Sequence, residues 1–113
     1  MSHFEHLPVF EKELAKLLRK YPSLTEDLEK LERLIEMYPV GYGSNFVTLH
    51  HSENIKIVKT RLACKSLKDR SMRLIYAYHD DKVTFVYLEL YFKGNKVNED
   101  RERIKEYLGR FQG

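Results

Sequence analysis

Apolar residues in the first third of the chain recur at intervals of three and four positions, the spacing that lines one face of an α-helix. Two such segments follow one another, the first ending before Pro22 and the second before Pro39. Their apolar stripes are Phe10, Leu14, Leu17, Leu18 and Tyr21, then Leu24, Leu28, Leu31, Ile35 and Tyr38. Ser23 and Glu26 form a capping-box pattern at the start of the second segment. The pattern predicts a helical hairpin whose two stripes pack on another layer.

The hydrophobic period changes to two after Asn54, where β-branched and aromatic residues become frequent. The predicted strands are Ile55–Ala63, Met72–His79 and Lys82–Phe92. Asp80 and Asp81 separate the last two strands, which indicates a hairpin. Two sets of residues alternate along the last strand: Val86, Leu88 and Leu90, and Phe85, Tyr87, Glu89 and Tyr91. Each set is expected on one face of the sheet.

Three weaker patterns complete the expected order of elements. Ser2–Leu7 resembles a short strand, Val40–Asn54 has the glycine-rich composition of a polar connection, and Asn98 suits the N-cap of a last helix. The apolar stripe of that helix is Ile104, Leu108 and Phe111, flanked by Tyr107. The sequence therefore predicts an α+β fold with the helices packed on one face of a small, mostly antiparallel sheet of three to four strands. An N-terminal helical hairpin precedes the sheet and a short C-terminal helix follows it.

Length and composition narrow the class of protein. The 113 residues, of which 42% are apolar and 33% charged, suit a single globular domain spanning residues 1–113. No apolar stretch approaches the roughly 18–20 residues of a membrane span, and Met1–Phe10 lacks the order of a signal peptide. The lone Cys64 forbids an internal disulfide. We expect a cytoplasmic protein with no membrane association.

Positive charge is concentrated in the second half of the chain. Met1–Asn54 holds six basic and nine acidic residues, whereas Ile55–Gly113 holds fourteen and eight. Within Lys56–Arg73, seven basic residues accompany one acid, Asp69. Such a cluster is typical of a surface that binds a phosphate backbone. A solvated edge strand protected by lysines is the alternative interpretation.

Common cofactor and metal motifs are missing from the sequence. His50 and His51 are adjacent and would point apart on a strand, and no histidine, cysteine or carboxylate spacing resembles a zinc site. There is no phosphate-binding glycine loop or Walker lysine. We therefore expect no metal, no cofactor and no nucleotide-driven chemistry.

Basic and tyrosine side chains interleave on the predicted strands. They are Lys59, Arg61, Lys65, Lys68, Arg73 and Lys93, with Tyr76, Tyr78, Tyr87 and Tyr91. Arginine and lysine can stabilise a phosphate that gains charge in a transition state, and tyrosine can stack on bases or assist proton transfer. The alternatives are plain sheet packing for the tyrosines and a solvated edge position for Arg73.

The stretch LACKSLKDRSMRLIYAYHDDKVTFVYLELYFKGNK, preceded by a helical hairpin and followed by a short helix, resembles the RelE/ParE toxin superfamily. That family shows a basic strand, a strand of the form xRxIYxx, an acidic turn, and a long apolar strand ending in a basic residue. The element order agrees from Phe4 to Leu108, and the specific part is confined to Lys59–Lys96.

The resemblance implies roles for individual residues. RelE-type toxins enter the ribosomal A site and cut mRNA without a metal, through attack of a 2′-hydroxyl on the adjacent phosphate. By this resemblance the candidate catalytic residues are Arg73, Arg61, Lys93, Lys65 and Tyr91, and the candidate RNA-binding residues are Lys59, Lys68, Arg70 and Lys96. The family's C-terminal proton-transfer residue would fall near Glu99, and Tyr91 or Glu89 could replace it if the strand register turns either toward Arg73.

The function implied is that of a type II toxin–antitoxin toxin acting as a metal-independent, ribosome-dependent mRNA endoribonuclease. Its partners would be ribosome-bound mRNA and an acidic, partly helical antitoxin, which the basic second half of the chain suits. Two alternatives stay open: a ParE-like gyrase inhibitor without nuclease activity, and a non-toxic RNA- or ribosome-binding domain.

Overall fold

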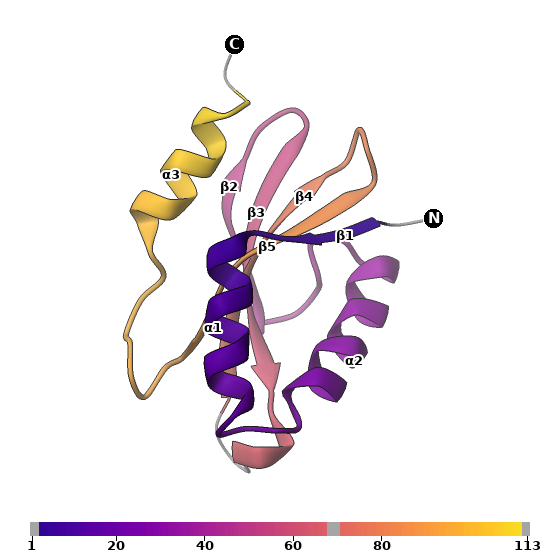
Figure 1. Cartoon of the computed structure of the whole chain (residues 1–113). Coiled ribbons are helices and arrows are strands. Elements are labelled where there is room, and N and C mark those ends of the chain that lie inside the picture. Colours follow the sequence, from indigo (N-terminus) through magenta and orange to yellow (C-terminus); the bar gives the residue numbers. More distant parts are fainter. Residues whose placement is uncertain (1–2, 68–70, 112–113) are drawn as a thin grey trace.

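The computed structural model describes residues 3–67 and 71–111, and it shows an α+β fold with one five-stranded sheet (Figure 1). The helices are α1 (Pro8–Leu18), α2 (Leu24–Met37), α3 (Arg101–Gly109) and a short 3-10 helix, η1 (Lys65–Leu67). The strands are β1 (His3–His6), β2 (Phe46–His51), β3 (Ile55–Ala63), β4 (Ser71–His79) and β5 (Thr84–Phe92). No helix in the described ranges is long and apolar enough to cross a membrane.

The sheet is mostly antiparallel, as predicted, in the order β1-β5-β4-β3-β2. Only β1 runs parallel to its neighbour, β5. The prediction of three to four strands was one strand short, because Val40–Asn54 is not a connection throughout: Phe46–His51 forms β2 against β3. A β-bulge between Thr48 and His50 breaks the alternation of this edge strand, so the period of two was not visible in the sequence.

One face of the sheet packs on α1 and α2 through aromatic residues. The Phe10 and Tyr87 rings lie 5.3 Å apart. The hydroxyls of Tyr76 and Tyr87 donate to the Pro39 carbonyl at 2.7 Å and the Glu32 carboxylate at 3.0 Å, respectively. Tyr76 and Tyr87 are fully buried, so the packing interpretation is confirmed for both.

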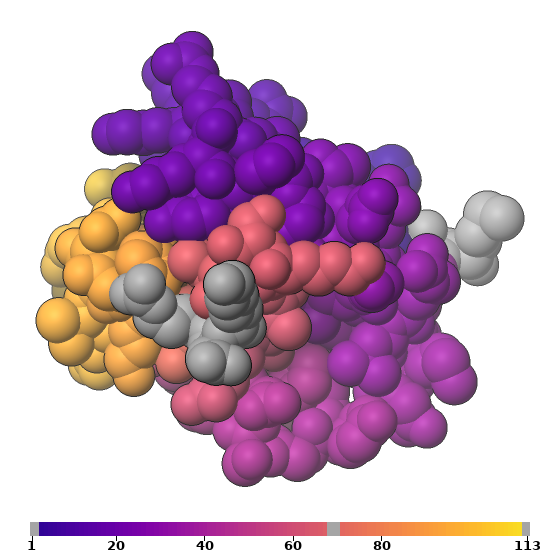
Figure 2. Space-filling model, turned by 90° about the horizontal axis from the view of Figure 1, so that it is seen from below, coloured from indigo at the N-terminus to yellow at the C-terminus, as the bar shows by residue number. Residues whose placement is uncertain are grey.

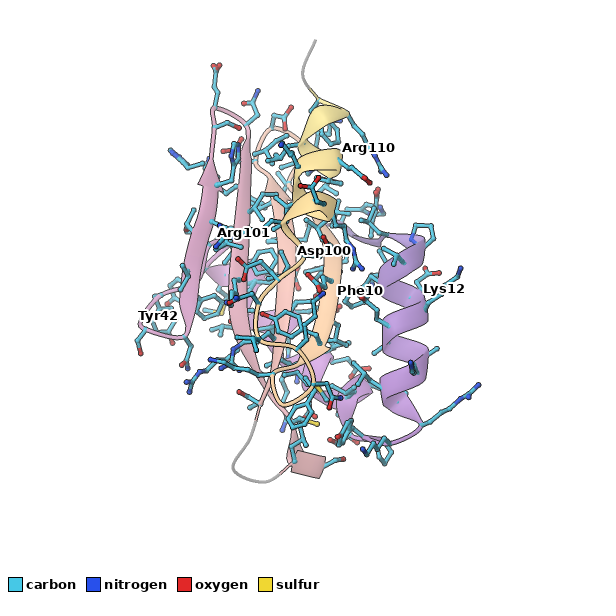
Figure 3. The ribbon with its side chains drawn as sticks, turned by 90° about the vertical axis from the view of Figure 1, so that its left-hand side faces the viewer. Phe10, Lys12, Tyr42, Asp100, Arg101 and Arg110 are labelled. Atoms are coloured by element: carbon cyan, nitrogen blue, oxygen red, sulfur yellow. The ribbon has the colours of Figure 1, made fainter. Side chains whose placement is uncertain are left out.

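Helix α3 lies on the opposite face, which the expectation of helices on one face missed (Figures 1 and 3). Its buried residue is Tyr107, whose hydroxyl hydrogen-bonds the ring of His79 at the end of β4. Phe111, predicted in the apolar stripe, is 45% exposed. Tyr107 can be buried because its polar tip finds a partner there. We call this surface of the sheet the α3 face.

Both predicted helix caps differ from those observed. Asp100 rather than Asn98 caps α3, and its carboxylate accepts the Arg103 N–H at 3.1 Å. Ser23 caps α2 by position only: its hydroxyl donates to Asp27 at 2.8 Å and accepts the Ser66 N–H at 3.0 Å. A tertiary contact to η1 has replaced the local capping box.

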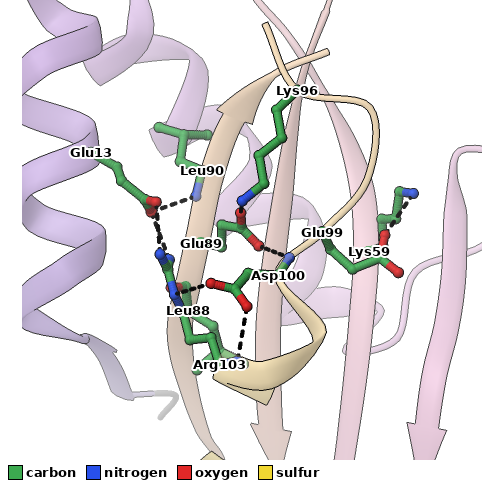
Figure 4. Close-up of polar contacts among 9 residues, drawn as sticks. All are labelled: Glu13, Lys59, Leu88, Glu89, Leu90, Lys96, Glu99, Asp100 and Arg103. Atoms are coloured by element: carbon green, nitrogen blue, oxygen red, sulfur yellow. Dashed lines mark hydrogen bonds and ion pairs between the residues drawn. The ribbon is translucent and has the colours of Figure 1, made fainter. Parts of the chain in front are cut away.

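A salt bridge closes the part of the β5 edge that β1 leaves uncovered, since β1 pairs only with Thr84–Tyr87. The Arg103 guanidinium binds the Glu13 carboxylate at 2.9 and 3.0 Å (Figure 4). The same two side chains satisfy the edge, because Glu13 accepts the Leu90 N–H at 3.2 Å and Arg103 donates to the Leu88 carbonyl at 2.9 Å. Helices from the two faces are thereby joined around the edge.

We expect Glu13→Ala to lower the free energy of unfolding by about 2–3 kcal/mol, because it leaves Arg103 and the Leu90 N–H without their partner. Urea unfolding measures this change. Glu29→Ala, the same substitution at an exposed position of α2, is the matched control and should change stability by less than about 0.5 kcal/mol. Equal effects of the two substitutions would show that other contacts hold this edge.

Candidate functional site

Arg61, Arg73 and Tyr91 lie side by side on three neighbouring strands of the α3 face. The register pairs Arg61 of β3 with Arg73 of β4, and Arg73 with Tyr91 of β5. Directly paired residues point to the same side of a sheet. We call these three residues the arginine row. It lies six residues along β4 from His79, where Tyr107 of α3 packs, so α3 itself does not reach it. Arg61 is exposed, whereas Arg73 and Tyr91 are buried.

A second bulge determines which side chains of β5 reach the α3 face. Ile75 pairs with Glu89 but Tyr76 pairs with Tyr87, so one residue of β5, Leu88, is inserted between these pairs. Tyr87 therefore faces α1, whereas Glu89 and Tyr91 face α3. The prediction that Tyr87, Glu89 and Tyr91 share a face was wrong, because an inserted residue reverses the alternation that follows it.

Arg73 is buried in the centre of the sheet, which contradicts its interpretation as a solvated edge residue. Its side chain donates to the Ser71 hydroxyl at 2.7 Å and the Met72 carbonyl at 3.3 Å, and the residue is 8% exposed. Burial, followed by the nearby Arg61, lowers the pKa of Arg73, while Tyr91 opposes the shift. The guanidinium nevertheless stays charged at neutral pH.

Tyr91 has a buried hydroxyl that no described residue satisfies with a hydrogen bond of normal geometry. The residue is 5% exposed. Burial raises the pKa of Tyr91 above 10, and the positive charge of Lys59 opposes part of that increase. Lys59 also lowers this pKa through hydrogen bonding to the hydroxyl, but the overall shift is upward, so the hydroxyl is protonated at neutral pH.

The next row of the α3 face carries ion pairs (Figure 4). Lys59 pairs across Ile75 with Glu89 in the strand register. The Lys59 ammonium binds the Glu99 carboxylate at 3.0 Å, and the Lys96 ammonium forms an ion pair with Glu89. Lys96 also lies 5.6 Å from the centre of the Tyr91 ring. Each carboxylate beside the arginine row is thus held by its own lysine.

These pairings set the charges of the second row. The hydrogen bond to Glu99 raises the pKa of Lys59 and outweighs the effect of burial. Burial alone would raise the pKa of Glu99, but its own backbone N–H, Lys59 and Arg101 lower it overall. At neutral pH Lys59 is therefore cationic and Glu99 is ionised.

The other candidates lie outside the row. Lys65, in η1, has its ammonium 3.7 Å from the Glu26 carboxylate, and both side chains are exposed. Lys93 is exposed one residue beyond β5. Lys68 and Arg70 lie outside the described residues. Lys59 was predicted only to bind RNA. That Glu99 is its counterion was not predicted; the available signal was the position of this acidic residue just before a predicted helix.

No cluster of three or more histidine, cysteine or carboxylate side chains suited to a metal occurs in residues 3–67 and 71–111. His79 has a structural role, because it packs on Tyr107 and hydrogen-bonds its hydroxyl. Burial and, to a lesser degree, Lys82 lower its pKa, so it is a neutral packing residue at physiological pH.

Comparison with known proteins shows a similarity at the level of structure. No protein-family model and no curated protein matches the chain. Among solved structures, it is similar to a chain in the crystal structure of the archaeal RelE–RelB complex from Pyrococcus horikoshii OT3, with a TM-score of 0.63 and 17% sequence identity. The similarity covers 82% of this chain and 96% of the other. The chain therefore has a RelE-like fold, as the sequence resemblance implied.

We expect Tyr91→Phe to leave stability unchanged or to raise it by about 1 kcal/mol, because it removes a buried hydroxyl that forms no hydrogen bond of normal geometry with any described residue. Tyr87→Phe is the matched control: it removes a hydroxyl that donates to Glu32 and should cost about 1 kcal/mol. Urea unfolding of both variants measures the difference. A Tyr91→Phe variant as unstable as Tyr87→Phe would mean that the Tyr91 hydroxyl has a partner in solution.

Proposed function

We propose that this chain is the toxin of a type II toxin–antitoxin pair and acts as a metal-independent, ribosome-dependent mRNA endoribonuclease. The observation that carries the proposal is the arginine row, in which two arginines and a protonated tyrosine lie side by side on the α3 face, with Arg61 exposed and Arg73 and Tyr91 buried beside it. The RelE-like fold supports the same conclusion.

The row suits cleavage of RNA by its own 2′-hydroxyl. In this reaction the 2′-oxygen attacks the adjacent phosphorus, the bond to the 5′-oxygen breaks, and a 2′,3′-cyclic phosphate forms. Arg73 and Arg61 bind the non-bridging phosphate oxygens and stabilise the charge that develops on them. Tyr91 donates its proton to the departing 5′-oxygen.

Glu99 accepts the proton of the attacking 2′-hydroxyl, and Lys59 orients it. Since its lowered pKa makes Glu99 a weak base, phosphate binding and leaving-group protonation contribute most of the acceleration. In this proposal the arginine row binds the phosphate, and we assign the alignment of the 2′-hydroxyl to the ribosome that holds the message.

An acidic, partly helical antitoxin is the proposed protein partner. The structure to which this chain is similar is a RelE–RelB complex. The second half of the chain has fourteen basic and eight acidic residues, and Arg61 and Arg73 have no carboxylate partner within the described residues. An acidic segment that covers the row would neutralise these charges and block RNA.

We expect Arg73→Ala to reduce cleavage by about 100-fold or more, because it removes the central phosphate-binding group. Primer extension on an mRNA translated in a reconstituted extract, with and without ribosomes, measures the cuts. Arg73→Lys keeps the positive charge but loses the two parallel N–H donors of the guanidinium, so its cleavage activity should be intermediate. Arg19→Ala, which removes an exposed arginine at the end of α1, is the control and should cleave normally.

Intact message at high concentrations of the folded wild-type protein would overturn the nuclease proposal. DNA supercoiling by gyrase would then test the ParE-like alternative, and growth after induced expression would separate a toxin from a harmless RNA-binding domain. Full activity of a folded Arg73→Ala variant would reject the assigned role of that residue.

Tyr91→Phe should lower the single-turnover cleavage rate by about 100-fold without lowering stability, because the proton donor is lost while no hydrogen bond of normal geometry to a described residue is removed. Time courses on ribosome-bound message measure the rate. Tyr78→Phe, on the other face of β4, is the control. A rate near that of the wild type would transfer the proton-donor role to another group.

A further inference from the structure

A groove opens at the edge of the sheet, between α2 and the end of β3. Phe46 and the α2 residues of its lining are on the face opposite the arginine row, and Arg61 is the residue that the groove shares with the row. The groove has a volume of about 450 Å³, in the range of small-ligand sites. Its lining includes Lys30 of α2, Asn45 and Phe46 before and in β2, and Arg61, Ala63 and Lys65 around the end of β3. Figure 2 views this end of the molecule, where the red segment around η1 meets α2 and the magenta start of β2. We call it the β3-edge groove.

The groove exposes unpaired backbone of the sheet edge. Strand pairing with β2 starts at Thr60, and the Arg61 N–H makes the last bond, to the Asn45 carbonyl at 3.1 Å. Backbone groups of a strand alternate in direction, so the N–H and C=O of Ala63 point to the same side of β3 as those of Arg61, two residues earlier. β2 does not extend this far, so this side of β3 is an open edge. The open edge is short, since η1 begins at Lys65. It therefore suits a small planar ligand better than an added strand.

The charges in the groove favour an anion. Lys30 and Arg61 form no ion pair within the described residues, and Lys65 has only its exposed contact with Glu26. The one carboxylate in the lining, Asp27, is 5% exposed and already accepts the Ser23 hydroxyl and the Lys65 N–H. The positive charge is thus largely unopposed.

An aromatic ring is fixed at the groove by the backbone. Phe46 lies so close to Gly41 that a Cβ at that glycine would be 2.1 Å from the ring. Gly41 also has a φ of +72°, in the region that favours glycine. The ring is therefore held in place from one side and is available for stacking in the groove.

We propose that the β3-edge groove binds one nucleotide of single-stranded RNA where the RNA passes from the arginine row over the sheet edge at Arg61, an inference that rests on the proposed function. Phe46 stacks on the base, the backbone of Ala63 and the side chain of Asn45 read its edge, and Lys30 and Lys65 hold its phosphate. Arg61 belongs to both sites. Ala63 is two residues beyond Arg61 on β3, a distance of about 7 Å, which is similar to the spacing between neighbouring nucleotides.

The test is the binding of a short single-stranded RNA, of about six nucleotides, whose 2′-hydroxyls are methylated so that it cannot be cleaved. Amide chemical shifts of the ¹⁵N-labelled protein report the contacts residue by residue. We expect the amides of Asn45, Ala63 and Lys65 to shift together with that of Arg73 during the titration.

Three substitutions sharpen this measurement. Lys30→Glu should weaken binding by about tenfold, because it reverses a phosphate-binding charge. Lys12→Glu is the matched control on the other side of the molecule and should change affinity by less than twofold (Figure 3). Phe46→Leu keeps an apolar residue but loses the stacking ring, and should weaken binding by at least about fivefold.

Three outcomes would overturn the proposal: shifts confined to the arginine row, no shift with millimolar RNA, or equal affinities of the Lys30→Glu and Lys12→Glu variants. Shifts of the groove amides by an acidic peptide and not by RNA would identify a protein segment as the occupant instead. Cleavage of ribosome-bound mRNA without RNA binding in the groove would reject this inference and leave the proposed function standing. RNA binding in the groove without cleavage of ribosome-bound mRNA would support this inference and reject the proposed nuclease function.

Discussion

Arg61 of β3 and Arg73 of β4 stand directly opposite each other, and the chemistry of the α3 face depends on this pairing of like charges. Like charges in paired positions destabilise a sheet, here with one of them buried. The Ser71 hydroxyl and the Met72 carbonyl solvate Arg73 without neutralising it. The fold thus maintains a concentrated positive charge that an anionic ligand relieves. A purely structural site would have placed a carboxylate there.

Carboxylates are present one row away, but they perform a different task. Glu89 accepts the Asp100 N–H at 2.8 Å and pairs with Lys96, while Glu99 pairs with Lys59. Together they hold the segment between β5 and α3 against the sheet (Figure 4). Because each acid has its own lysine, neither arginine has a counterion among residues 3–67 and 71–111. The separation of these two rows keeps Glu89 and Glu99 away from the arginines, and the bond to Lys59 holds Glu99 in position beside them.

Most of the fold could be predicted from the sequence, because an element with one buried face shows the hydrophobic periodicity of a helix or a strand. The bounds of β3 were predicted in full, and β4 and β5 to within two residues. The two bulges were not predictable, since an inserted residue has no composition of its own. One hid β2 and the other reversed the face of Tyr91. The side on which α3 packs depends on tertiary contacts such as that of Tyr107 with His79.

The bulge in β5 explains why the site and the edge of the sheet are linked. It turns Glu89 and Tyr91 to the α3 face, which completes the arginine row and anchors α3. It also lies where Arg103 reaches the Leu88 carbonyl, so the guanidinium that closes the β5 edge binds at the same irregularity. A regular strand would place Tyr91 under α1, away from Arg73. One inserted residue therefore determines both how this side of the sheet is closed and which side chains meet the arginines.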